Sequence, residues 1–258
     1  MRRLQSTITS KLPALAGVVV LLTVWQLACL SGLVPHYMLP SPVEVAVAFV
    51  SDAPALWENL CITLQEAFLG LVIGVTMGFF FAVAMDAFEI LYRVFYPILV
   101  ITQTIPTVAI APLLVLWFGY EMTPKVILIV LVTFFPVTVG LLDGFRAVDR
   151  DAVGLLRSMG AGRWQIFRYL KCPSALPQFF SGLRIAAAYS VVGAVISEWL
   201  GGFGGLGVYM TRVKKAFAFD KMFAVIFLIS AVSLALMALV ELAERRCMPY
   251  RRLEQRKK

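Results

Sequence analysis

The sequence predicts an all-α, polytopic membrane protein with six transmembrane helices and one long cytoplasmic loop. Two observations predict this fold class. Of the 258 residues, 60% are hydrophobic and only 15% are charged, whereas a soluble domain carries about a quarter charged residues. The apolar residues also occur in long blocks, and in lipid only helices or closed barrels satisfy every backbone polar group. The excess of apolar side chains must therefore face lipid.

Six blocks are long enough to cross a bilayer, which takes about 20 apolar residues. We expect the spans at about 12–34, 64–85, 96–118, 125–142, 183–200 and 222–243. They would form one transmembrane domain over 12–245, between a cytoplasmic tail at 1–11 and a basic cytoplasmic tail at 246–258. The first block is too long for a cleaved signal peptide, so we interpret it as an anchor.

The distribution of positive charge predicts the orientation. The net charge is +8, and with both termini inside the cell most of the 23 lysines and arginines lie on the cytoplasmic side, as the positive-inside rule requires. The basic tail would then meet anionic inner-leaflet lipid, and we expect no nucleic-acid partner. A smaller cluster in one outer loop contains Arg212, Lys214, Lys215 and Lys221. It could dock a partner, attract an anionic solute or form a solvated loop face.

Outside the membrane, the prolines of the loop over 35–61 restrict regular structure to one short amphipathic helix at 42–51. In the second span, Gly70, Gly74 and Gly78 recur every four residues and form a bare stripe on one helix face. Such stripes let a neighbouring backbone approach closely. The register predicts a tight helix contact, although glycine is also simply common in membrane helices.

Three prolines interrupt the third block, and each one frees a carbonyl group and kinks the helix. In lipid a freed carbonyl needs protein or water nearby. Because Gln103 and Thr104 lie between these prolines, the kinked helix is a candidate wall of a solute path, although packing alone would also explain the bend. Ser190 and Glu198 in the fifth span are further candidates for that path.

The longest cytoplasmic loop, at 143–181, contains the stretch "LLRSMGAGRWQIFRYLKCP". Its pattern predicts two short helices at 151–159 and 163–171, joined by a glycine turn. Isolated helices of this length are marginal in water, so the pair must dock, either on lipid or in a groove of a cytosolic protein. The residues assigned to docking are Leu156, Met159, Gly160, Ala161, Gly162, Arg163, Trp164, Phe167, Leu170 and Pro173.

The sequence patterns typical of catalytic, metal and cofactor sites are either incomplete or do not occur. The four cysteines are scattered and the single histidine is His36, so we expect neither a metal site nor a disulfide framework. The stretch "GFGGLG" at 202–207 lacks the strand-helix context of a dinucleotide site, and the dipeptide Gly-Lys of a P-loop does not occur. Glu66 and Glu198 lie near the edges of different blocks, so we expect no paired acids in the membrane, no catalysis and no cofactor.

The cytoplasmic loop resembles that of binding-protein-dependent ABC importer permeases. The family pattern is Glu-Ala-Ala, three spacers, Gly, nine spacers, an aliphatic residue, one spacer and Leu-Pro. Gly160 matches the glycine, Leu170 the aliphatic residue and Pro173 the proline. Cys172 stands where Leu is usual, and residues 154–156 depart from Glu-Ala-Ala. The stretches "MLPSPVEV", "QTIPTVAIAPLLVLWFG" and "ISEWLGGFGGLGVYM" are similar to the nitrate, sulfonate and taurine branch.

Within that branch, "GAVISEWLGG" followed by "TRVKKAFAFDKMFA" is most similar to permeases for pyrimidine precursors of thiamine, with riboflavin permeases nearly as close. The resemblance implies the ABC importer permease fold and a passive subunit in the bacterial inner membrane, whose cytoplasmic loop is a coupling helix seated on a separate ATPase. It also implies two ATPase subunits, a second permease chain in a homodimer, and an extracellular or periplasmic solute-binding protein. The alternatives are a membrane enzyme and an ion-coupled carrier, which would show ionisable groups near the midplane and internal repeats.

Overall fold

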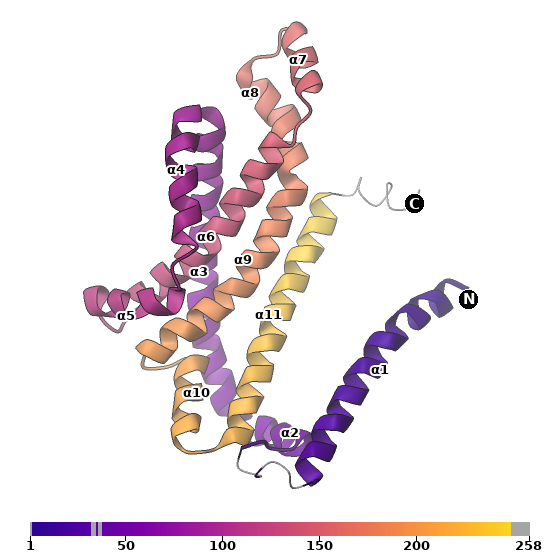
Figure 1. Cartoon of the computed structure of the whole chain (residues 1–258), viewed down its shortest axis with the longest axis vertical. Coiled ribbons are helices and arrows are strands. Elements are labelled where there is room, and N and C mark those ends of the chain that lie inside the picture. The colour runs from indigo at the N-terminus through magenta and orange to yellow at the C-terminus, as the bar shows by residue number, and fades with distance from the viewer. Residues whose placement is uncertain (1, 32–34, 36–37, 249–258) are drawn as a thin grey trace. The chain divides into compact units, whose positions relative to one another are not determined.

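The structure, a computed structural model, describes residues 2–31, 35 and 38–248 and is helical throughout its regular elements (Figure 1). The all-α fold class is therefore confirmed. In chain order the elements are α1 (Arg2–Leu30), α2 (Pro42–Ser51), α3 (Ala53–Ala87), α4 (Glu89–Thr102), α5 (Thr107–Phe118), α6 (Met122–Arg146), α7 (Arg150–Ser158), α8 (Arg163–Ile166), a π-helical turn (Phe167–Lys171), α9 (Cys172–Leu200), α10 (Leu206–Lys215) and α11 (Phe219–Cys247). His36, part of the predicted first span and most of the predicted basic tail lie outside the described residues.

Within the described residues, four helices are long and apolar enough to cross a bilayer. They are Ala53–Ala87, Met122–Arg146, Arg163–Leu200 and Phe219–Cys247. The pair α4 and α5 passes the same test together and counts as a fifth span. The apolar stretch of α1, Ala16–Leu30, is shorter. The described residues thus contain four or five spans, against the six predicted.

The predicted third span consists of two helices rather than one kinked helix. The chain bends by 98° between α4 and α5. Proline lacks an N–H group and disfavours helical geometry in the residue before it, so the helix cannot continue through Pro106. At the break, the hydroxyl groups of Thr102 and Thr104 donate to the carbonyl oxygens of Leu99 and Ile101, at 2.7 and 2.8 Å.

The chain divides into two compact units, the first formed by residues 1–58 and 209–228 and the second by residues 59–208 and 229–258. In the first unit the predicted helix at 42–51 is confirmed as α2. It begins with a capping box, because the Ser41 side chain accepts from the Glu44 N–H and the Glu44 carboxylate accepts from the Ser41 N–H. Residues of α2 pack with Trp25, Phe223 and Ala224 in a small apolar core.

At the end of α2, an ion pair and a hydrogen bond join this helix to the later part of the first unit. The Lys221 ammonium group lies 2.8 Å from the Asp52 carboxylate, and the Tyr209 hydroxyl donates to the second oxygen of that carboxylate. The hydrogen bond from Lys221, followed by the one from Tyr209, lowers the pKa of Asp52 from its ordinary value. Burial, and then the bond to Asp52, raises the pKa of Tyr209.

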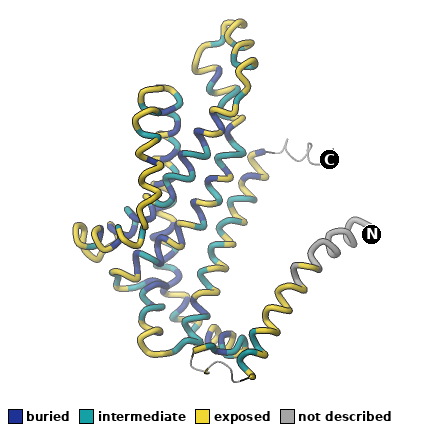
Figure 2. Tube along the Cα trace, in the orientation of Figure 1, coloured by how far each residue is buried: buried dark blue, intermediate teal, exposed yellow. Residues whose placement is uncertain are grey.

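In the second unit α6 and α9 lie side by side (Figure 1), and buried positions are concentrated along them (Figure 2). Glycines at the contact bring the two backbones together. A Cβ atom on Gly140 would lie 2.8 Å from the Gln178 carbonyl oxygen, and one on Gly182 would overlap the Pro136 carbonyl oxygen. Helix association in lipid relies on such close packing, because lipid tails are as apolar as the side chains they replace.

The three glycines of the predicted stripe in α3 face α6. A Cβ atom on Gly74 would overlap the Thr133 hydroxyl, and one on Gly78 would lie 3.0 Å from the Phe134 carbonyl oxygen. A Cβ atom on Gly70 would overlap the Ile129 side chain. That these contacts stabilise the helix assembly stays a prediction.

We expect Gly182→Ala to lower the free energy of unfolding by about 1–3 kcal/mol, the usual effect of overpacking, because its methyl group would meet a backbone oxygen that cannot rotate away. The matched control is Gly17→Ala in α1, where a Cβ atom would have no neighbour within 4 Å. Thermal unfolding in detergent measures both variants. Equal melting temperatures would contradict the close α6–α9 contact.

We expect the Asp52 ion pair to make stability depend on pH. Since the folded-state pKa of Asp52 is lowered below the unfolded value of about 4, the pair stabilises the fold above that pH and the contribution is lost as the pH falls further. The melting temperature of Asp52→Asn should therefore lie below the wild-type value at pH 7 and approach it below about pH 4. Glu58→Gln, an exposed acid of α3, is the control, and an Asp52→Asn deficit that persists at pH 3 would contradict the assignment.

Candidate functional site

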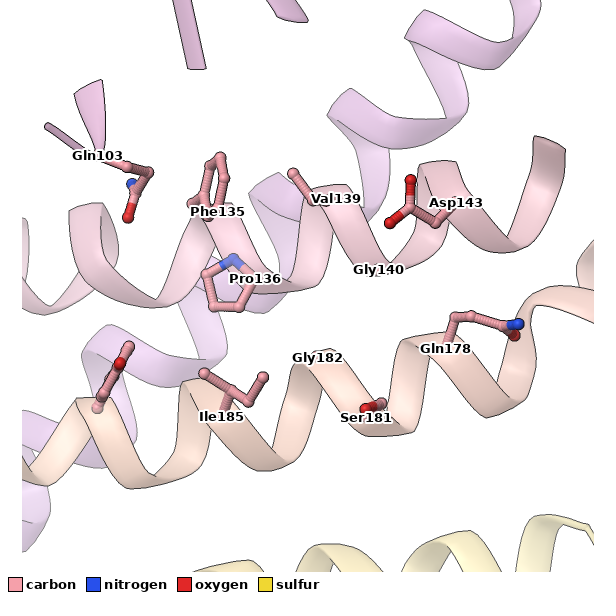
Figure 3. A pocket seen from close by; sticks show the side chains of 11 residues that line it. Gln103, Phe135, Pro136, Val139, Gly140, Asp143, Gln178, Ser181, Gly182 and Ile185 are labelled. Carbon is pink, nitrogen blue, oxygen red and sulfur yellow. The ribbon is translucent and has the colours of Figure 1, made fainter. Parts of the chain in front are cut away.

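A cavity of about 470 Å³ runs along the α6–α9 pair (Figure 3). This volume falls in the range of small-molecule sites, about 300–1,000 Å³. Its walls come from α6, α9 and the bend between α4 and α5. The lining residues are Gln103, Phe135, Pro136, Val139, Gly140, Asp143, Gln178, Ser181, Gly182, Ile185 and Tyr189.

A second cavity of about 170 Å³ shares Gln103 and Tyr189 with the first. It adds Thr107, Val132, Val192, Gly193 and Ile196. On α9 the lining residues of both cavities recur every three or four positions and so form one stripe from Gln178 to Ile196. At 1.5 Å per residue this stripe is about 27 Å long, close to the roughly 30 Å thickness of a bilayer core. We call the surface lined by both cavities the α6–α9 groove.

The groove combines apolar walls with a few hydrogen-bonding groups. Two amides, Gln103 and Gln178, can donate and accept, as can the hydroxyl groups of Ser181 and Tyr189, while the Asp143 carboxylate accepts. Among the described residues no group of three or more His, Cys, Asp or Glu side chains could hold a metal ion. This arrangement can bind and orient a small solute.

Of the four predicted path residues, Gln103 lines the groove and lies at the bend between α4 and α5. Thr104 is exposed next to it, with its hydroxyl donating to Ile101. Ser190 is fully buried and donates to the Ala187 carbonyl oxygen at 2.9 Å. Glu198 is 2% exposed and lines neither cavity. The groove residues Asp143, Gln178, Ser181 and Tyr189 were missed. The helical spacing of polar and small residues along α9 could have indicated the last three, whereas nothing in the sequence pointed to Asp143, which lies on α6.

The expectation of no paired acids in the membrane is wrong. Lys125, near the start of α6, lies 2.5 Å from the Glu66 carboxylate with both side chains 5% exposed. The Glu66 and Glu198 carboxyl groups also face each other. Three ionisable groups thus meet at one end of the helix assembly, because α6 begins where α9 ends. Such groups are stable in lipid only when they pair with one another.

Glu198 also holds the glycine-rich loop after α9. Its carboxylate accepts from the Gly207 N–H at 2.6 Å and from the Thr63 hydroxyl at 2.7 Å. The Thr63 oxygen in turn accepts from the Leu206 N–H, and the Asn59 side chain accepts from the Gly205 N–H. Residues 202–205 therefore form a turn, with Gly205 at a φ of 111°, and the turn and the first residues of α10 are pinned to α3 and α9.

The helix pair predicted within the loop at 143–181 is present as α7 and α8, and we call residues 150–171 the peg. The turn between the helices is a Schellman motif. Gly160 has a φ of 86° and donates to the Arg157 carbonyl oxygen, while Ala161 donates to that of Leu156. The Gln165 side chain accepts from the Gly162 N–H at 2.7 Å and caps α8.

The exposed apolar side chains of the peg differ in part from the predicted docking set. Four of them are 63–74% exposed, namely Leu155, Met159, Trp164 and Tyr169. Met159 and Trp164 were assigned to docking, whereas Leu155 and Tyr169 were missed and Leu156 and Leu170 are half-buried. The four-residue spacing of Leu155 and Met159 is the signal that could have found the former.

The second helix of the peg does not end at residue 171, as the sequence predicted, but continues as one helix from Arg163 to Leu200. The π-helical turn makes this possible. Its wider hydrogen bond, from the Cys172 N–H to the Phe167 carbonyl oxygen, accommodates Pro173, which has no N–H to donate. Lys171 binds both Asp86 oxygens at 2.7 and 2.9 Å and ties the base of the peg to α3.

Residues 70–248 match the family described as "Binding-protein-dependent transport system inner membrane component". The chain belongs to this family. A probable ABC transporter permease of Haemophilus influenzae is 40% identical over 84% of this chain and 89% of its own length. A formylaminopyrimidine transport permease of Halalkalibacterium halodurans is 37% identical, covering 90% and 93% of the two chains. A riboflavin transport permease of Chloroflexus aurantiacus is 32% identical, covering 87% and 85%.

A solved structure titled as an amino acid ABC transporter shares the fold of the permease, with a TM-score of 0.65 at 22% identity over 78% of this chain and 97% of that one. The permease is thus a multi-pass component of the inner membrane in an ABC importer of the predicted branch. Members of this family are transport components, and separate ATPase subunits hydrolyse the ATP.

We expect Lys125→Met to lower the free energy of unfolding by about 3–5 kcal/mol, because it leaves the buried Glu66 carboxylate without its cation. Adding Glu66→Leu to that variant should restore most of the loss, since a buried ion pair can be replaced by apolar side chains at little cost. Thermal unfolding in detergent measures both. A double variant as unstable as the single one would contradict this account.

Proposed function

We propose that the permease forms half of a solute translocation path along the α6–α9 groove and that its peg couples this path to separate ATPase subunits. The observation that carries the proposal is one continuous helix, Arg163–Leu200, which begins in the peg and lines the groove. Any displacement of the peg therefore reaches the groove through a single rigid element, without passing through a flexible loop.

The peg has the features of a docking element. Its exposed apolar side chains offer a surface for a groove on a cytosolic protein, and its inner residues anchor it to the membrane helices. Phe167 packs on Phe145 of α6 with ring centroids 5.4 Å apart. In the proposed mechanism ATP draws two ATPase subunits together, each moves the peg seated on it, and the two permease halves alternate between outward and inward access.

A second permease chain would complete the path. In the single chain the groove residues Ile185, Tyr189 and Val192 are 47%, 52% and 42% exposed, and Asp143 is exposed as well. A carboxylate facing lipid is costly, so a covering partner is favoured, and a second copy of this chain is the simplest one. The complex would be a homodimer with two ATPase subunits and an extracellular or periplasmic solute-binding protein.

For the orientation and the domain boundaries, this proposal adopts what we expect from the sequence. Both termini lie in the cytoplasm, and one permease domain extends over 12–245. The peg belongs to the coupling loop predicted at 143–181, but residues at the two ends of that range, Asp143, Gln178 and Ser181, are parts of α6 and α9 in the structure and line the groove. The permease itself is passive, and a partner chain hydrolyses the ATP. Of the predicted path residues, only Gln103 and its neighbour Thr104 stay in the proposed path, because Ser190 and Glu198 are enclosed within the subunit.

The best candidate solute is a pyrimidine precursor of thiamine. The relative named for formylaminopyrimidine transport supports it, with 37% identity over 93% of that relative. Riboflavin is the first alternative and is supported in the same way at 32% identity; sulfonates, taurine and nitrate follow. The ion-coupled carrier is disfavoured, because the buried ionisable groups bind each other and the loop at 202–207 rather than the groove.

Uptake by vesicles tests this function. The permease, co-expressed with its ATPase and binding protein and reconstituted in liposomes, is expected to accumulate radiolabelled formylaminopyrimidine only when ATP is hydrolysed. Riboflavin and taurine serve as competing solutes. Uptake by the permease alone, driven by an ion gradient, would overturn the proposal in favour of a carrier.

We expect Gly160→Val to reduce ATP-driven uptake and ATPase binding at least ten-fold while membrane insertion is unchanged, because a β-branched residue is strained at a φ of 86°. Gly154→Val in α7 is the matched control, since a Cβ atom has open space at both glycines and only Gly160 has a positive φ. Co-purification of the ATPase and uptake rates measure the effect. Normal ATPase binding by Gly160→Val would exclude the peg as the docking element.

A further inference from the structure

We propose that the α6–α9 groove selects neutral or positively charged solutes that carry hydrogen-bond donor groups, and that Asp143 is the charged side chain that meets them. The inference rests on the proposed function, because it assigns a solute class to the path proposed above. The inference separates the candidate solutes of this branch into neutral or cationic heterocycles, which the groove would accept, and anions, which it would reject.

The groove carries one kind of charge. Among the described residues that line its two cavities, Asp143 is the single charged side chain, and no lysine, arginine or histidine is present. Asp143 forms no ion pair with another described residue, and its side chain borders the cavity (Figure 3). Asp143 is exposed, and a cleft lined by one sign of charge focuses the field, so the carboxylate attracts cations and repels anions there.

The cations nearest in the chain are engaged elsewhere. Arg146, one turn beyond Asp143, lies over the Tyr92 ring at 3.2 Å and pairs with Glu89 at 3.8 Å. Arg184, one turn beyond Ser181, pairs with Glu244 at 3.5 Å. Neither lines the groove, so neither compensates the negative charge there.

The polar groups of the groove also favour donors on the solute. An ionised carboxylate only accepts hydrogen bonds. The side-chain oxygen of Gln178 is buried without a hydrogen-bond partner, and a buried acceptor left unsatisfied is costly. Asp143 and Gln178 together therefore present more acceptors than donors. Amine and amide N–H groups fit this set, whereas a sulfonate or nitrate ion would find no cation to pair with.

Charge-selective thiol labelling tests the inference. In the assembled transporter the four native cysteines are replaced by alanine, and Ser181→Cys places one thiol in the groove. A cationic and an anionic methanethiosulfonate of similar size are then compared. After correction for their rates with a free thiol, we expect the cationic reagent to react roughly ten-fold faster, the effect of one nearby charge at reduced dielectric.

Variants of the acid identify the source of the preference. Asp143→Asn should remove most of it and Asp143→Lys should reverse it. Glu121→Gln, an exposed acid at the opposite end of α6, should leave it unchanged. Tyr189→Cys, whose position borders both cavities, provides a second reporter. Equal rates for the two reagents at both reporters, or a preference that survives Asp143→Asn, would overturn the inference.

The labelling does not depend on transport, so the two proposals fail separately. ATP-driven uptake of formylaminopyrimidine is measured in the same vesicles. Uptake without a charge preference in the groove overturns the inference about Asp143 and leaves the proposed function standing. A charge preference without ATP-driven uptake overturns the proposed function.

Discussion

Direct contact between the backbones of α6 and α9 is the constraint on which the second unit depends. Lipid offers little hydrophobic drive for helix association, so stability must come from packing at short range, and Gly140 and Gly182 supply that packing. The same two glycines and Pro136 line the larger cavity. The helix contact is therefore also the floor of the groove. Any larger residue at Gly140 or Gly182 would both push the two helices apart and reduce the cavity volume.

The long helix of the permease connects three tasks along one axis. Its first turns belong to the peg, where Phe167 and Lys171 anchor it to α6 and α3. Its middle carries the stripe that lines the groove. Near its end, Glu198 fixes the glycine-rich loop by accepting from the Gly207 N–H. In the proposed function, a rigid helix that reaches from the peg to this loop is the physical route by which a cytosolic motor acts on the membrane path.

The polar groups inside the membrane fall into two classes that differ in their partners. Glu66 pairs with Lys125, Glu198 accepts from Thr63 and from the Gly207 N–H, and all three ionisable groups are almost wholly buried, although one Glu66 carboxylate oxygen has no hydrogen-bond partner. Asp143 and Gln178 border the groove and keep unused hydrogen-bonding capacity. In the proposed function the first class stabilises the subunit, and the second is available to a solute. A buried ion pair alone would have resembled the proton relay of a carrier, but this cluster lies away from the groove and is bound to the loop at 202–207, which argues against that interpretation.

The sequence by itself determined the helical membrane class, the family branch, the helix at 42–51 and the glycine turn of the peg. These features depend on hydropathy, on motif spacing and on local backbone geometry, and each of these signals comes from residues that are near one another in the sequence. Only the tertiary structure decided which polar residues face the groove. Thr63 and Glu198, for example, meet across 135 positions of the chain, and the rotation of α9 buries Ser190 while Gln178 and Tyr189 line the cavity. The direction in which a side chain points is set by the neighbouring helix, and hydropathy carries no information about which helix that is.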